Sequence, residues 1–177
     1  MRILLTGLPG SGKSTVLMRV VNDLTSKGLR VGGIITPETR VHDRRTGFRV
    51  VDLYTGKEAA LASSEARTGP QLGRYRVDVN AFEAIALPAL DYAEKQCDLV
   101  CIDEIGKMEF FSKRFVEKIN ALFESEKPMI AVVHRDFVRL YGKYGTLITV
   151  TLENRDHLVT EIPALILNNR RKGQGTC

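Results

Sequence analysis

Residues 7–14 read Gly-Leu-Pro-Gly-Ser-Gly-Lys-Ser, the complete pattern G-x-x-x-x-G-K-[ST] of a phosphate-binding loop. The apolar run Arg2–Thr6 before it predicts a short buried strand, and the run that begins at Thr15 predicts a helix. A strand, a glycine loop and a helix in that order are the context that this motif requires. The glycines let backbone N–H groups face the phosphates, and the helix N-terminus adds a positive partial charge. The stretch therefore predicts a nucleoside-triphosphate site in an α/β fold.

The residues of the loop have separate expected roles. We expect Lys13 to contact the β- and γ-phosphates and to act in catalysis, and the Ser14 hydroxyl to ligate Mg²⁺. The residues expected to bind the nucleotide are Gly7, Leu8, Pro9, Gly10, Ser11, Gly12, Lys13, Ser14 and Thr15.

Size and charge describe an ordinary globular protein. A length of 177 residues, with 44% hydrophobic and 27% charged residues, fits one domain. The net charge of +5 could indicate a nucleic-acid partner. The basic residues 170–172 and the triphosphate site explain the charge without one, and we favour this second interpretation.

The cysteines and the ends of the chain indicate a cellular compartment. Cys97, Cys101 and Cys177 form neither a disulfide framework nor a four-ligand zinc pattern, so reduced thiols in a cytoplasmic protein are expected. Met1 leads directly into the first strand, which leaves no room for a signal peptide. No apolar stretch approaches the roughly 18 residues needed to cross a bilayer. We expect a monomer without a membrane partner.

Strand and helix patterns alternate along the chain, which predicts α/β architecture with a mainly parallel sheet. Residues 48–54 and 58–61 predict a β-hairpin added to that sheet, and residues 37–45 and 62–79 predict loops. The expected domain is 1–167, followed by a basic, disordered tail over 168–177. The other expected strands are 29–36, 99–102, 129–133 and 146–150, and the expected helices are 13–27, 80–95 with Asn80 as cap, 112–124 with Ser112 as cap, 136–141, and 154–167 with an interruption near Pro163.

A second acidic motif completes the predicted site. Four apolar residues, 99–102, run directly into Asp103 and Glu104, which is the Walker B pattern. Ligands lie at the carboxyl ends of strands in an open parallel sheet, so Asp103 is expected to hold Mg²⁺ opposite the phosphates. We expect Glu104 to be catalytic, because a carboxylate there can orient or deprotonate an attacking water.

The segment Ile102-Asp-Glu-Ile-Gly-Lys-Met-Glu109, followed by Phe-Phe-Ser112, resembles the signature of the small RecA-like nucleoside-triphosphatases. This family includes the cancer-related nucleoside-triphosphatase and its thermophile relatives. Further segments that resemble it, within residues 1 to about 167, are the phosphate loop 7–15 and residues 33–40, 46–49, 73–77 and 153–156.

The resemblance implies a RecA-like three-layer P-loop fold, with another strand between the phosphate-loop strand and the Walker B strand. It also implies Mg²⁺-dependent hydrolysis of nucleoside triphosphates (ATP, GTP, CTP and UTP) to diphosphate and phosphate, with low base specificity. The sequence offers no certain arginine finger, so we expect turnover on the order of 10⁻⁴ to 10⁻² per second.

Several other residues have two open interpretations. Lys107 could stabilise charge on the γ-phosphate, as a third catalytic residue, or could be an exposed turn lysine. Glu109 could pair with Lys107 or cap the following turn. The remaining candidates, for which a structural role is favoured, are His134, Arg135, Arg40, Arg44, Arg45, Tyr75, Tyr141 and Tyr144.

Two rival functions use the same loop. A small-molecule or nucleotide kinase would need an acceptor pocket and an arginine-bearing lid, whereas adjacent Asp103 and Glu104 favour water as the acceptor. A non-enzymatic switch or nucleic-acid partner is suggested by the net charge alone.

Overall fold

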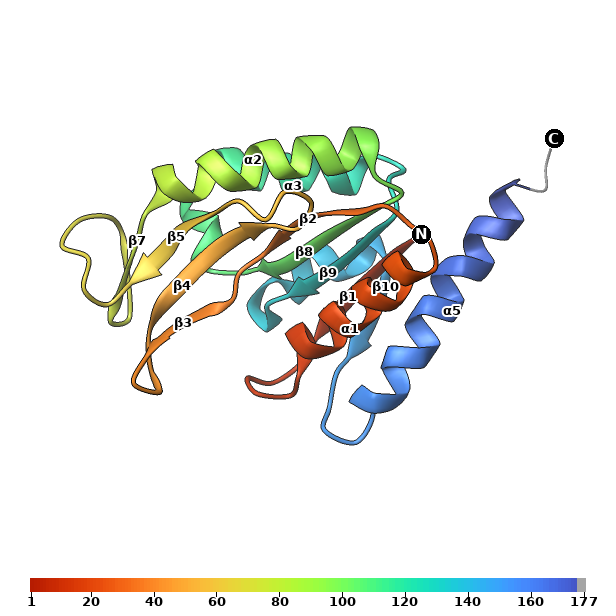
Figure 1. The fold of residues 1–177 in the computed structure, drawn as a ribbon, viewed down its shortest axis with the longest axis horizontal. Helices are drawn as coiled ribbons and strands as arrows, with labels where there is room; N and C mark the ends of the chain where they lie inside the picture. Colours follow the sequence, from red (N-terminus) through yellow and green to blue (C-terminus); the bar gives the residue numbers. More distant parts are fainter. Residues whose placement is uncertain (175–177) are drawn as a thin grey trace.

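The structure is a computed structural model that describes residues 1–174, and it has three layers (Figure 1). One sheet forms the middle layer, and helices cover both of its faces. The α-helices are α1 (Lys13–Ser26), α2 (Val79–Gln96), α3 (Lys113–Glu124), α4 (Val138–Tyr141) and α5 (Arg155–Gln174), and the 3₁₀ turns are η1 (Glu109–Phe111), η2 (Arg135–Phe137) and η3 (Gly142–Tyr144).

The sheet has a parallel half and an antiparallel half. Its strands are β1 (Arg2–Thr6), β2 (Val31–Ile35), β3 (Glu38–Val41), β4 (Arg44–Asp52), β5 (Glu58–Ser63), β6 (Gln71–Leu72), β7 (Tyr75–Val77), β8 (Leu99–Ile105), β9 (Met129–Val133) and β10 (Thr146–Thr149). The order is β10-β1-β9-β8-β2-β4-β5-β7-β6, with β3 paired to β4. The five strands from β10 to β2 are parallel, and the rest are antiparallel. The mainly parallel sheet and the added hairpin β4–β5 are confirmed.

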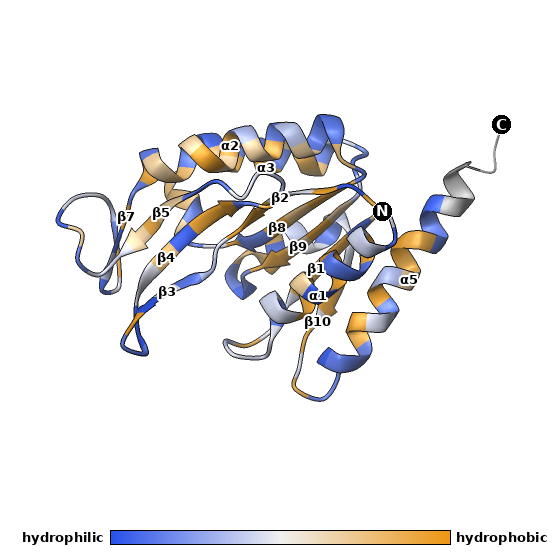
Figure 2. Cartoon of the chain, viewed as in Figure 1, coloured by the Kyte–Doolittle hydropathy of each residue, from blue (hydrophilic) through white to orange (hydrophobic). Residues whose placement is uncertain are grey.

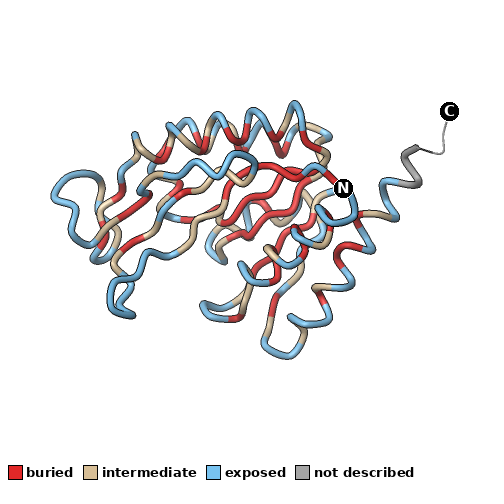
Figure 3. The backbone as a smooth tube through the Cα atoms, in the orientation of Figure 1, coloured by how far each residue is buried: buried red, intermediate tan, exposed pale blue. Residues whose placement is uncertain are grey.

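Alternate residues of the parallel strands enter different cores. On β1, Ile3 and Leu5 pack with α1 and α5, while Leu4 packs with α2 and α3. Since both faces are covered, β1, β2, β8 and β9 are largely apolar, as Figure 2 shows, and buried along most of their length, as Figure 3 shows, whereas the edge strand β10 is mostly exposed. This is why their sequences predict strands without a polar alternation.

The strand between the two halves of the predicted site is β9. It pairs with β1 through Leu4 and Ala131, and with β8 through Ala131 and Ile102. The expectation of one intervening strand is confirmed. The phosphate loop after β1 and the acidic end of β8 therefore lie at the same edge of the sheet.

The predicted loop over 37–45 is wrong. Residues 38–45 form the hairpin of β3 and β4, whose two-residue turn places His42 and Asp43 at φ 46° and 59°. Asp and His tolerate this left-handed conformation better than most residues. The exposed edge strand β3 carries little apolar sequence, so its composition resembles that of a loop.

Two further boundaries differ from expectation. The predicted loop 62–79 contains the small hairpin of β6 and β7. The cap of α2 is Asp78, whose side chain accepts a hydrogen bond from Ala81 N, rather than Asn80. The cap of α3 is Ser112, as expected, and its hydroxyl accepts from Phe115 N.

The last helix, α5, is longer than predicted. It passes through Pro163 and continues to Gln174, so residues 168–174 are helical instead of disordered. Pro163 removes one backbone donor. The burial of Ile162 and Ile166 in the core shared with α1 offsets this loss. Residues 175–177, the end of the predicted tail, lie outside the described residues. Within the described chain, no helix has the length and apolarity needed to cross a membrane.

The close approach of β2 to β8 requires Gly33. Its φ is +127°, and a Cβ there would lie 2.0 Å from Cys101 O. Gly33→Ala should therefore lower the free energy of unfolding by about 3 kcal/mol or more, measured by urea denaturation. Gly56→Ala is the matched control, because Gly56 also has positive φ (+72°) but a Cβ there meets nothing within 4 Å. Equal losses in the two variants would contradict this account.

Candidate functional site

The phosphate loop connects β1 to α1 at the carboxyl edge of the parallel strands (Figure 1). Its glycines have the conformations that the motif needs, with φ of +146° at Gly7, +78° at Gly10 and +94° at Gly12. Residues other than glycine rarely adopt these backbone angles, so the three glycines let the loop curve around an anion. The hydroxyl of Ser11 is buried in this loop without a hydrogen-bond partner among the described residues.

Lys13, the first residue of α1, turns its ammonium back into the loop. Its Nζ donates to Leu8 O at 2.9 Å and to Gly7 O at 3.2 Å. Both acceptors are backbone carbonyls of the phosphate loop itself. The charge of Lys13 is thereby held over the concave side of the loop, where the triphosphate is expected.

Ser14 and Asp103, the two predicted Mg²⁺ ligands, are in contact. Ser14 Oγ donates to Asp103 Oδ1 at 3.1 Å, although the residues are 89 positions apart. Burial raises the pKa of Asp103 to about 6, while the Ser14 hydrogen bond and Lys13 lower it. A nearly buried carboxylate beside a hydroxyl supplies the hard oxygen ligands that Mg²⁺ prefers. No described cluster of three or more His, Cys, Asp or Glu could hold a metal, so phosphate and water oxygens would have to complete this site.

Glu104 and Glu109 approach each other at Gly106. A Cβ on Gly106 would lie 2.9 Å from Glu104 Oε1 and 2.9 Å from Glu109 Oε2. Burial and the charge of Asp103 raise the pKa of Glu104, and Lys13 lowers it. Burial raises the pKa of Glu109 to about 8. The sequence indicated only a structural role for Glu109. Both carboxylates lie so close to residue 106 that a side chain there would contact them, so this glycine is the sequence feature that connects Glu104 with Glu109.

Lys107 does not pair with Glu109. Its Nζ lies 2.5 Å from Asp136 Oδ2, and this ion pair lowers the pKa of Asp136. Both side chains are about half exposed. The ion pair holds the Lys107 ammonium at the carboxyl edge of β8 and β9. Lys107 is three residues from Glu104 in the chain, but its side chain points toward Asp136 in η2. The sequence pattern did not identify Asp136 as a site residue, because polar residues are common after a strand and do not by themselves indicate a function.

Most of the remaining candidates have structural contacts. His134 Nδ1 accepts from Asp136 N, which caps η2, and Arg135 is exposed. Arg40 and Arg45 pair with Glu38 within the β3–β4 hairpin at 2.8 and 2.7 Å. Of the three tyrosines, Tyr75 packs on Phe48, and Tyr141 and Tyr144 stack on Phe123. The exposed Arg44, at the start of β4, keeps both interpretations.

A segment that the sequence did not single out forms another wall of the site. The chain after β10 passes so close to the phosphate loop that a Cβ on Gly7 would lie 2.5 Å from Val150 O. Val150 N also donates to Thr6 O at 2.7 Å. The site is therefore built from the ends of β1, β8 and β10, which come from all three thirds of the chain.

Comparison with known proteins agrees with this geometry. A family model described as NTPase matches residues 2–163. The chain belongs to this NTPase family. The nucleoside-triphosphatase THEP1 of Pyrococcus abyssi is 41% identical over 162 residues, which are 92% of this chain and 90% of that protein. THEP1 of Methanothermobacter thermautotrophicus is 42% identical over 168 residues, or 94% of this chain and 96% of that protein.

Two solved structures of the NTPase family resemble the fold over nearly its whole length. THEP1 from Aquifex aeolicus superposes with a TM-score of 0.82 at 34% identity, covering 94% of this chain and 99% of that one. A human cancer-related nucleoside triphosphatase superposes with a TM-score of 0.78 at 30% identity, covering 93% and 96%. The chain is a nucleoside-triphosphatase, and the predicted family and enzyme class are confirmed.

The buried acid Glu109 should make stability depend on pH. Its folded pKa of about 8 exceeds the ordinary 4.5, so between these values the folded state keeps a proton that the unfolded state releases. Stability from this group is therefore complete below about pH 4.5 and is lost as pH rises through 8. Glu109→Gln should remove this loss, which is up to about 4 kcal/mol, in urea unfolding at pH 5 and pH 8.5.

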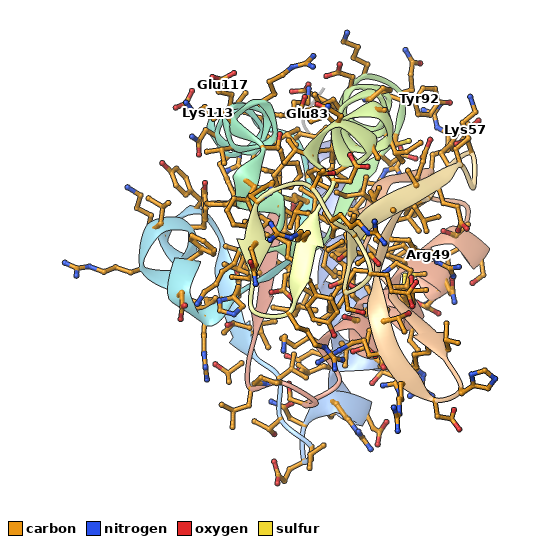
Figure 4. All side chains as sticks on the ribbon, turned by 90° about the vertical axis from the view of Figure 1, so that its left-hand side faces the viewer. Arg49, Lys57, Glu83, Tyr92, Lys113 and Glu117 are labelled. Atoms are coloured by element: carbon orange, nitrogen blue, oxygen red, sulfur yellow. The ribbon has the colours of Figure 1, made fainter. Side chains whose placement is uncertain are left out.

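The matched control is Glu117→Gln on the exposed face of α3, labelled in Figure 4. It should keep the pH dependence of the wild-type protein. A Glu109→Gln variant with the same pH dependence as the wild type would show that Glu109 stays ionised.

Proposed function

We propose that this enzyme hydrolyses nucleoside 5′-triphosphates, including ATP, GTP, CTP and UTP, to diphosphate and phosphate. The reaction is proposed to depend on Mg²⁺, to be slow and to discriminate little between bases. The observation that carries the proposal is the contact of Ser14 Oγ with Asp103 Oδ1 at 3.1 Å, beside Lys13 and one residue from Glu104. With this contact, the expected metal ligands Ser14 and Asp103 lie at the same edge of the sheet as the expected phosphate clamp, Lys13, and the expected base, Glu104.

The first part of the mechanism is substrate binding. Backbone N–H groups of the phosphate loop and of the first turn of α1 would face the phosphates, and Lys13 would exchange its carbonyl partners at Gly7 and Leu8 for phosphate oxygens. Ser14 and Asp103 are the residues that would hold Mg²⁺. When bound, the metal neutralises charge on the β- and γ-phosphate oxygens and orients them. A clamp of this kind would fix the γ-phosphate for attack by a water held at Glu104.

The second part is the activation of water. Burial and the charge of Asp103 raise the pKa of Glu104, which makes its carboxylate a better proton acceptor. We propose that it orients the attacking water and takes its proton. Lys107 would leave Asp136 and stabilise the γ-phosphate oxygens as charge transfers, since both side chains of its ion pair are about half exposed.

Phosphate release from the wild-type protein tests the function as a whole. Release from ATP, GTP, CTP and UTP should be detected with Mg²⁺, should stop with EDTA, and should differ between bases by less than about tenfold. Rates on the order of 10⁻⁴ to 10⁻² per second are expected, because no arginine finger is evident. A preference of more than about a hundredfold for one base would contradict low specificity. Phosphate transfer to an added nucleoside would identify a kinase instead.

Lys13→Ala should weaken triphosphate binding by about 10- to 100-fold, because a hydrogen bond to a charged group is worth about 1.5–3 kcal/mol. A titration with a fluorescent triphosphate measures this affinity. Lys57→Ala is the matched control, since Lys57 is an exposed lysine in the β4–β5 turn (Figure 4). Unchanged affinity in the Lys13 variant would rule out its role as the phosphate clamp.

Glu104→Gln should keep the affinity for triphosphate and Mg²⁺ but slow single-turnover hydrolysis by about 10²- to 10⁴-fold, which is typical of the loss of a general base. Binding is retained because the negatively charged Glu104 carboxylate does not attract the phosphates, so its removal costs no binding energy. Lys107→Ala in the same assay should also lose rate and keep affinity. A near-wild-type rate in Glu104→Gln would exclude it as the base and leave Glu109 as the next acid to test.

A further inference from the structure

The side chain of Arg155 lies directly against the phosphate loop. Arg155 is the first residue of α5, and a Cβ on Gly12 would lie 3.3 Å from its Cδ and 3.8 Å from its Nη1. Gly12 is the last glycine before Lys13 and α1. An exposed arginine from the far end of the chain therefore covers the point where the loop becomes a helix.

The backbone around Arg155 is fixed by Asn154. The Asn154 side chain accepts from Thr151 N at 2.8 Å and donates to Thr149 O at 2.8 Å, and Arg155 N donates to Thr151 O at 3.2 Å. In contrast, the guanidinium of Arg155 has no hydrogen bond or ion pair with any residue that the structure describes. A rigid backbone thus presents a planar cation whose face and edges are available to a ligand.

A pocket of about 200 Å³ opens beside this guanidinium, between α1 and α5. Each helix contributes residues one turn apart, Thr15 and Arg19 from α1 and Arg155 and Val159 from α5. Figure 1 shows the two helices side by side, with the loops that precede them at the same edge of the sheet. At the rim, Arg19 pairs with Asp156 at 3.2 Å. The pocket therefore has a cationic plane, an aliphatic wall at Val159 and a solvated polar rim.

The position of the triphosphate connects this pocket to the substrate. Lys13 takes the β- and γ-phosphates and Ser14 the metal, while backbone N–H groups cradle the α- and β-phosphates. The α-phosphate thus lies toward the end of the loop at Thr15, and the ribose leaves over the exposed first turn of α1. That turn is where Thr15 lines the pocket.

We propose that this pocket is the nucleobase subsite and that Arg155 is its stacking platform, an inference that rests on the proposed function. A guanidinium stacks on an aromatic ring through its planar, weakly hydrated cation. Every base offers a π-face, so stacking is tolerant of base identity. Asp156 is the acidic residue that lines the pocket, and it forms an ion pair with Arg19. We therefore expect the base to be held by stacking on its ring rather than by hydrogen bonds to Asp156. Arg155 would accordingly bind purine and pyrimidine triphosphates alike and account for low base specificity.

The test compares nucleoside triphosphates with inorganic tripolyphosphate, which has no base or ribose. Arg155→Ala should raise the dissociation constants of ATP and CTP by about fivefold or more, the lower end of measured base–aromatic stacking. The inhibition constant of tripolyphosphate against ATP hydrolysis should change by less than about twofold. Arg155→Lys keeps the charge but loses the plane, and should be as defective as Arg155→Ala.

Arg114→Ala is the matched control, because Arg114 is an exposed arginine of α3 on the opposite helix layer. It should leave all three constants unchanged. Equal weakening of ATP and tripolyphosphate by Arg155→Ala would make Arg155 a phosphate contact and overturn the platform. Full affinity in Arg155→Lys, or unchanged ATP and CTP affinity in Arg155→Ala, would also overturn it while leaving wild-type turnover, and so the proposed function, intact. A wild-type protein that neither binds nor hydrolyses triphosphates would remove both.

Discussion

The hydrogen bond from Ser14 Oγ to Asp103 Oδ1 connects the two motifs on which the site depends. It exists because β9 separates β1 from β8 by one strand width and aligns their carboxyl ends. That alignment in turn requires helices on both faces, since only a sheet buried on both sides keeps parallel apolar strands in this register. The arrangement of the expected site residues therefore depends on the three-layer packing as well as on the glycine conformations of the loop.

The same burial controls the charge of the site. Desolvation raises the pKa values of Asp103, Glu104 and Glu109. The charge of Asp103 also raises the pKa of Glu104, and the charges of Glu104 and Asp103 raise that of Glu109. Lys13 is the cation that opposes this effect at Asp103 and Glu104. A neutral Glu109 at pH 7 reduces repulsion beside Glu104, so the buried site carries fewer negative charges than its three carboxyl groups suggest. This favours the approach of a triphosphate, which is itself an anion.

The sequence predicted the parallel core and the Walker motifs well, because each depends on local patterns. Apolar runs such as 99–102 and 129–133 can be buried strands, and the glycine spacing of 7–14 has one known use. The hairpin of β3 and β4 was missed because an exposed edge strand has a polar composition. The ion pair of Lys107 with Asp136 and the approach of Arg155 to Gly12 join segments far apart in the chain, which no pattern in one segment can show. Glu109 lies in the same segment as Glu104, but the sequence pattern alone does not show that its side chain is buried.

The position of β1 has a consequence for the synthesis of the protein. This strand is made before both of its neighbours, β9 and β10, which begin at Met129 and Thr146. Ile3, Leu4 and Leu5 therefore leave the ribosome long before any strand exists to pair with them. Since this backbone pairing closes a loop of well over a hundred residues, β1 must remain unpaired by β9 and β10 until at least β9, which ends at Val133, has emerged. Translation thus delivers the phosphate loop well before the strands that flank β1 in the sheet.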